Sequence, residues 1–207
     1  MSLRQVVKNI SYSFGANIVS LGVSVLMVMF VPKLLPVEDY GKWQLFLFYF
    51  SYLGFLHFGW EDGIYLRYAG KSFEELSPHV FSGQFLGIAI LQLVLAGLAF
   101  LFSQVFIVDP IKQTVFVCAV SLAVFVNFNT SCNFIMQITN RIKDYARIVL
   151  SEQIVLLLLV FFFLLLGFKQ FHYMYIAKLG SLSVVSVMCF YLCRRLWTTH
   201  IGSIHDV

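Results

Sequence analysis

Long uncharged apolar runs, separated by short polar segments, dominate the pattern of this 207-residue chain. A helix needs about 20 mostly apolar residues to cross the hydrocarbon core of a bilayer. The runs are continuous and do not alternate with a period of two, which favours helices over the strands of a membrane barrel. We therefore predict six membrane-spanning helices, at Ile10–Leu35, Trp43–Leu66, Val80–Val108, Gln113–Ile138, Ile148–Gly167 and Phe171–Cys193.

The composition supports an all-α polytopic membrane protein. Hydrophobic residues make up 60% of the chain and charged residues 12%, whereas soluble domains carry about 25% charged residues. So few charges could not cover the apolar surface of a soluble fold, which excludes a cytosolic enzyme, a disordered chain and a secreted disulfide scaffold. The four cysteines fall inside apolar runs, where cysteine is usually a small hydrophobic side chain. We expect residues 1–207 to form a single six-helix domain.

The positions of lysine and arginine predict the orientation in the membrane. With a cytoplasmic N-terminus, nine basic residues lie in inner segments and four in outer ones, with Lys178 inside a span. The prediction is a bacterial inner-membrane protein with both termini in the cytoplasm, whose first span is too long for a cleaved signal peptide. The net charge of +4 forms no basic stripe, so nucleic acid is not an expected partner. The inner residues are Arg4, Lys8, Arg67, Lys71, Arg141, Lys143, Arg147, Arg194 and Arg195; the outer ones are Lys33, Lys42, Lys112 and Lys169.

Short connections predict that consecutive helices pack as antiparallel neighbours. The longest inner loop, residues 67–79, contains Ser72 three residues before Glu75. This capping-box spacing predicts a brief helix at the membrane interface.

Amide side chains inside the fourth predicted span are the first candidates for a binding site. Asn129, Asn133 and Gln137 are spaced by four and should share one face of a helix. That face either makes hydrogen bonds to other helices or walls a hydrophilic cavity for a polar cargo such as sugar. Asn17 lies on a polar row of the first span and is a candidate to face the same cavity, although small polar residues on a packing face explain that row without any cargo.

Charged residues within or near the spans are further candidates. Lys178 either snorkels to the interface or points inward to bind a phosphate or carboxylate. Glu152 is either an interfacial carboxylate near Arg147 or a buried group that couples transport to an ion or proton. His57 and Glu61 are four residues apart on the second predicted span, which predicts a shared face near its cytoplasmic end. His57 and Glu61 either form a charged inner gate or a pair that couples transport to an ion, or they only lie at the headgroup boundary.

Motifs for enzymatic chemistry are missing from the sequence. It contains no GxxxxGK[ST] loop, no HExxH and no cysteine–histidine cluster. We expect no catalytic residue, no metal site and no cofactor, and we do not expect an enzyme.

Two segments resemble bacterial polysaccharide (O-antigen type) flippases of the multidrug/oligosaccharidyl-lipid/polysaccharide exporter superfamily. The first is Pro36-Val-Glu-Asp-Tyr-Gly-Lys-Trp43 between the first two spans, and the second is Gly59-Trp-Glu-Asp-Gly-Ile-Tyr-Leu-Arg-Tyr-Ala-Gly70. The entry Arg4…Lys8-Asn9 and the pair Asn140-Arg141 are also similar to that family.

The resemblance implies a specific function. Flippases of this family pair two six-helix lobes that rock to carry an oligosaccharide on undecaprenyl pyrophosphate from the inner to the outer leaflet. The chain resembles the N-terminal lobe only, so we expect a truncated or half-size form that needs a second lobe or a homodimer partner. The alternatives are a drug or cation exporter of the same superfamily, a non-transporting membrane subunit of a polysaccharide assembly complex, and a membrane-embedded transferase.

Overall fold

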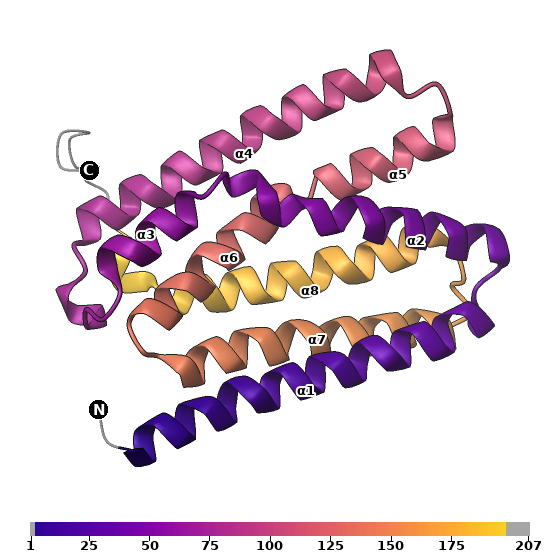
Figure 1. Ribbon diagram of the computed structural model, residues 1–207. Helices are drawn as coiled ribbons and strands as arrows, with labels where there is room; N and C mark the ends of the chain where they lie inside the picture. Colours follow the sequence, from indigo (N-terminus) through magenta and orange to yellow (C-terminus); the bar gives the residue numbers. More distant parts are fainter. Residues whose placement is uncertain (1–2, 198–207) are drawn as a thin grey trace.

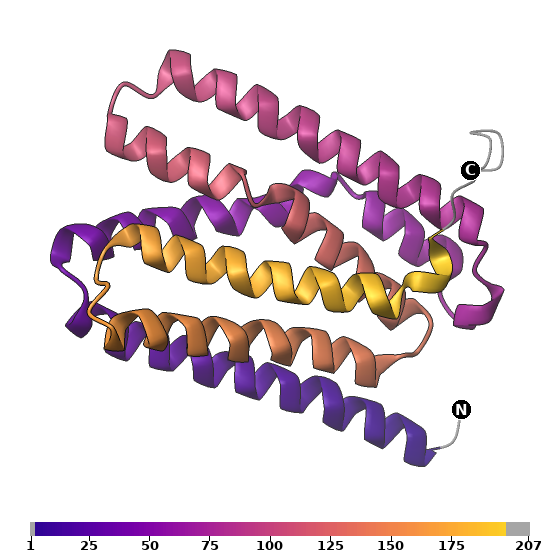
Figure 2. The same ribbon diagram turned by 180° about the vertical axis from the view of Figure 1, so that it is seen from behind.

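The computed structural model describes residues 3–197, a range that is helical and contains no β-strand. Its helices lie lengthwise in one bundle, and the first and last described residues lie at the same end (Figure 1 and Figure 2). The α-helices are α1 (Leu3–Leu34), α2 (Val37–Tyr52), α3 (Trp60–Tyr68), α4 (Pro78–Phe106), α5 (Pro110–Val120), α6 (Ala123–Ile138), α7 (Ile142–Leu165) and α8 (Phe171–Leu192). Three short 3₁₀ helices are η1 (Leu53–His57), η2 (Phe73–Glu75) and η3 (Arg194–Leu196).

Five stretches in residues 3–197 are long and apolar enough to cross a membrane. This confirms the expectation of an all-helical chain with apolar, membrane-type helices. The predicted fourth span is built from α5 and α6, which meet at a turn over Ser121 and Leu122. The five stretches are Val7–Leu34, Pro78–Phe106, Pro110–Ile138, Ile142–Leu165 and Phe171–Leu192.

The second predicted span, Trp43–Leu66, is not one continuous helix. α2 ends at Tyr52, η1 follows, and α3 starts at Trp60. Phe58 and Gly59 between them have φ of 48° and 79°, and two successive left-handed residues cannot continue a right-handed helix. Figure 1 shows α2 and α3 end to end, with the break between them. The predicted count of six continuous spanning helices is therefore not confirmed.

Local sequence explains where other helices begin and end. Asn140 has a φ of 58° and ends α6 in a Schellman motif, in which the Arg141 N–H donates to the Met136 carbonyl at 2.7 Å. The predicted capping box is confirmed, because Ser72 and Glu75 exchange side-chain and backbone hydrogen bonds around η2.

Helix packing follows the sequence order only in part. α7 packs along α8, and α4 contacts α5, as the short connections predict. α1, however, packs along α7 and touches α2 only slightly, so the prediction was wrong for the first helix pair. The apolar stripe of α1, Ala16, Val23 and Val31, is buried, because its spacing of seven and eight keeps one face toward the bundle.

Candidate functional site

A layer of buried polar side chains separates two apolar cores along the bundle. The first core includes Leu53 and Ala123, and the second includes Ile64 and Cys132. Between Ala123 and Cys132, α6 carries several polar residues that are almost completely buried: Asn127, Asn129 and Ser131. Buried amides and hydroxyls need partners, so these three positions fix how α6 contacts its neighbours.

Asn129 makes hydrogen bonds to α8 with both of its polar atoms. Its Nδ2 donates to the Leu182 carbonyl at 3.3 Å, and its Oδ1 accepts from Ser186 Oγ at 2.9 Å. The side chain thus connects two helices, which is the first of the two interpretations that the sequence left open.

The three predicted amides of α6 differ in their environment. Asn129 is buried, Asn133 is half-buried with its Oδ1 enclosed and unpartnered among residues 3–197, and Gln137 is exposed. A helix advances 100° per residue, so the row turns by about 40° at each step and by about 80° overall. The row therefore starts inside the bundle and ends on its surface.

Asn17 lies on the surface of α1, in a groove that also involves the α6–α7 turn. This α1 groove is open and has a volume of about 480 Å³. At one end, Asn9 Nδ2 donates to Asn140 Oδ1 at 2.7 Å. Asn9 and Asn140 were missed as site residues, because nothing in the sequence shows that the start of α1 meets the end of α6. The groove is lined by Asn9, Ile10, Ser13, Phe14, Asn17, Asn140 and Ile142.

Lys178 and Glu152 form an ion pair between α8 and α7, with Nζ 2.8 Å from Oε1. Lys178 is 6% exposed and also lies over the ring of Phe50, 4.6 Å from its centroid. It therefore points inward and does not snorkel. Glu152 pairs with Lys178, while Arg147 pairs with Asp144 at 3.0 Å.

The predicted shared face of His57 and Glu61 was wrong, because the helix break lies between them. His57 ends η1, and its Nδ1 accepts a hydrogen bond from the Gly59 N–H at 3.2 Å. Glu61 is fully buried in the first turn of α3 and accepts a hydrogen bond from Ser131. A spacing of four aligns side chains only on an unbroken helix.

Two amides from neighbouring helices bind the backbone of η1 at this break. Asn127 Nδ2 donates to the Leu53 carbonyl at 3.2 Å, and Gln92 Nε2 donates to the Leu56 carbonyl at 3.0 Å. We call Glu61, Gln92, Asn127 and Ser131 the helix-break cluster. Sequence reasoning found Glu61 but not the other three, since their common role exists only where the helix is broken.

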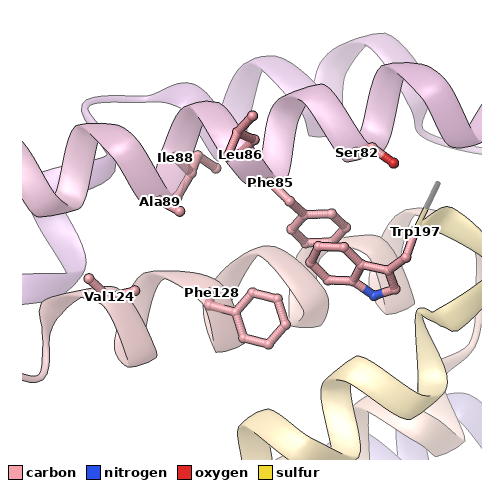
Figure 3. Close-up of a pocket in the computed structure, with 8 residues that line it drawn as sticks. All are labelled: Ser82, Phe85, Leu86, Ile88, Ala89, Val124, Phe128 and Trp197. Atoms are coloured by element: carbon pink, nitrogen blue, oxygen red, sulfur yellow. The ribbon is translucent and has the colours of Figure 1, made fainter. Parts of the chain in front are cut away.

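An apolar pocket of about 190 Å³ lies between α4 and α6, close to the end of η3 (Figure 3). Trp197 stacks on Phe85 there, with ring centroids 4.6 Å apart and ring planes within 19° of each other. The pocket suits a hydrocarbon segment and not a polar cargo. It is lined by Ser82, Phe85, Leu86, Ile88, Ala89, Val124, Phe128 and Trp197.

Comparisons of the sequence with family models and curated proteins, and of the structure with solved structures, give no match. The likeness to polysaccharide flippases therefore stays a prediction from motifs. The structure shows what two of the motif residues do locally: Pro36 directly precedes α2, and Gly59 supplies the second left-handed residue of the helix break.

Proposed function

We propose that this chain is one lobe of a transporter that moves lipid-linked oligosaccharide across the bacterial inner membrane. The observation that carries this proposal is the α1 groove, where Asn9, Ser13, Asn17 and Asn140 gather on an otherwise apolar surface. An amide that faces hydrocarbon costs free energy unless it finds water or a polar partner. Such a groove is explained by contact with water, with a polar cargo or with a second lobe.

The groove has a size and chemistry that suit a sugar. Its volume of about 480 Å³ lies within the range of about 300–1,000 Å³ typical of small-molecule sites. The Asn17 amide offers two N–H donors and a carbonyl acceptor, which matches hydroxyl groups that both donate and accept hydrogen bonds. Asn9 and Asn140 already share one hydrogen bond with each other. Ile10 and Phe14 in the same groove provide apolar contacts for sugar C–H groups.

In this proposal the chain crosses the membrane six times, and α2 and α3 together make the second crossing. α2 and α3 lie end to end along the bundle, and the first and last described residues share one end (Figure 1). With the predicted orientation, that end is cytoplasmic. In the proposed orientation the α1 groove, which begins at Asn9 near the start of α1, faces the side where lipid-linked oligosaccharides are assembled.

A single lobe has no partner to rock against, so alternating access needs a second lobe. We propose that a second copy of this chain supplies that lobe. Lys178 does not meet cargo in this conformation, because Glu152 neutralises its charge. A pyrophosphate would have to displace that carboxylate to bind Lys178.

One observation favours the alternative of a cation-driven exporter of small molecules. The sequence places Glu61 near a span end, but the structure buries it completely. A buried intramembrane carboxylate is typical of ion-coupled transport. The two functions differ in the cargo that is moved.

The test is reconstitution of the full chain into liposomes that contain a fluorescent N-acetylhexosamine oligosaccharide on undecaprenyl pyrophosphate. An impermeant quencher then reports how fast the probe crosses. We expect crossing at least tenfold faster than in empty liposomes, and loss of most of that rate in Asn17→Leu. Ser24→Ala is the control, because its hydroxyl already binds the Ser20 carbonyl within α1. Crossing no faster than in empty liposomes, or an unaffected Asn17→Leu, would overturn the proposal.

A further inference from the structure

The break between η1 and α3 leaves backbone carbonyls that a continuous helix would have used. The amides of Asn127 and Gln92 donate to two of them, on Leu53 and Leu56. Because these amides give their N–H groups to the backbone, their own oxygens are left over. Asn127 Oδ1 and Gln92 Oε1 are buried and have no hydrogen-bond partner within residues 3–197.

Glu61 adds a third unpartnered oxygen and a negative charge to the same region. Its side chain is fully buried, Oε1 accepts from Ser131, and Oε2 has no partner in the described chain. No lysine, arginine or histidine in residues 3–197 forms an ion pair with it. A buried, unpaired carboxylate is strongly unfavourable, and each unpartnered acceptor adds to that cost.

The four residues of the helix-break cluster come from three separate helices that meet at the break. Glu61 is on α3, Gln92 on α4, and Asn127 and Ser131 on α6. The Ser131 hydroxyl lies within hydrogen-bond distance of both the Asn127 backbone carbonyl and the Glu61 carboxylate. Ser131 follows Asn127 by one helical turn, so Glu61 contacts α6 one turn away from Asn127. The carbonyls of Leu53 and Leu56, which carry partial negative charge at the C-terminal end of the α2–η1 segment, contact the amides of Asn127 and Gln92.

We propose that the helix-break cluster binds one monovalent cation, with Glu61, Asn127 and Gln92 as oxygen ligands. Oxygen atoms of carboxylates and amides are the ligands of hard cations, and a single carboxylate balances a single positive charge. A bound cation would supply the kind of partner that these buried oxygens lack. Broken membrane helices are a recurrent place for such ions, because their ends offer carbonyls that an intact helix does not.

The binding site stands on this geometry alone, whereas its use to drive transport rests on the proposed function. The test uses the purified full chain in detergent, with Na⁺ as the probe. Thermal unfolding is followed as NaCl replaces choline chloride at constant ionic strength and constant pH. Ligand binding to the folded state raises its melting temperature, so the dependence on Na⁺ gives an apparent affinity.

We expect Na⁺ to stabilise the wild-type chain and Glu61→Gln to weaken the apparent affinity at least tenfold. Glu61→Gln removes a buried charge, so it should fold and be at least as stable as wild type without Na⁺. Asn127→Ala keeps the carboxylate and should weaken the affinity several-fold. Glu74→Gln is the matched control, because Glu74 is an exposed glutamate on η2.

Three outcomes would overturn the site: no Na⁺ response in the wild type, an equal response in Glu61→Gln, or a Glu61-dependent response to pH with none to Na⁺. The last would make Glu61 a proton site. Failure of oligosaccharide crossing would leave this measurement intact, so the two proposals can fail separately.

Discussion

Lys178 of α8 and Glu152 of α7 form an ion pair inside the bundle, with 2.8 Å between Nζ and Oε1. The Lys178 side chain keeps 8% of its area exposed and that of Glu152 keeps 23%. Removal of Glu152 leaves the more deeply buried Lys178 charge unpaired, whereas removal of Lys178 leaves Glu152, which can still reach water. The first change should therefore lower the free energy of unfolding more than the second.

Neutralising the two members of this pair should have unequal effects on stability. We expect Glu152→Gln to lower the free energy of unfolding by about 3 kcal/mol, Lys178→Met by less, and the double variant to regain much of the loss. Denaturation of each variant in mixed detergent micelles measures the coupling. Additive losses in the double variant would show that the pair does not interact.

Substitutions of Asn129 and Gln137 on α6 should change the stability of the fold by different amounts, because only Asn129 bonds to another helix. Asn129→Ala removes two hydrogen bonds to α8 and should destabilise the fold by about 1–2 kcal/mol. Gln137→Ala, at an exposed position, should change stability by less than about 0.5 kcal/mol. The same detergent denaturation checks both, and equal effects would contradict the observed contacts.

Substitutions of the two acidic residues at the start of α2, Glu38 and Asp39, should also change stability by different amounts. Asp39 Oδ1 accepts a hydrogen bond from the Phe171 N–H at 3.0 Å, so it binds the first turn of α8. Asp39→Ala should cost about 1 kcal/mol, as loss of a helix cap does. Glu38→Ala removes an ion pair with Lys42 in which the Glu38 side chain is 73% exposed, and it should cost close to nothing. A Glu38→Ala variant that is less stable than Asp39→Ala would contradict this assignment.

The left-handed conformation of Asn140 predicts that glycine destabilises this position less than alanine does. Asn140→Ala should lose about 1 kcal/mol or more, because a Cβ without a compensating polar group is unfavourable at a φ of 58°. Asn140→Gly should be more stable than Asn140→Ala, although both remove the hydrogen bond to Asn9. Thermal unfolding of the three chains ranks them. The opposite order would mean that side-chain contacts and not backbone strain decide this position.

The sequence predicted the elements that depend on local pattern. Apolar runs located the long helices, and the spacing of Ser72 and Glu75 located η2, because these features act over a few residues. The break at Phe58 and Gly59 was missed because the run from Trp43 to Leu66 is long enough for one span and is charged only at Glu61 and Asp62, near its end. Contacts between distant residues, such as Asn9 with Asn140 or Gln92 with Leu56, could not be read from the chain, since they depend on which helices pack together.

The claim that the α1 groove binds a polar cargo is most directly tested by whether water reaches the groove in a membrane. Asn17→Cys should react quickly with a charged, membrane-impermeant thiol reagent added from the cytoplasmic side of inverted vesicles, because thiols ionise and react only in water. Ile18→Cys is the matched control, since Ile18 is the next residue on α1 and is 53% exposed, on a face that we expect to contact lipid. We predict at least tenfold faster labelling at position 17 than at position 18. Equal rates would show that the groove is no more accessible to water than the neighbouring face, and no labelling at position 17 would place the groove against hydrocarbon. Either result would contradict the proposed transport function.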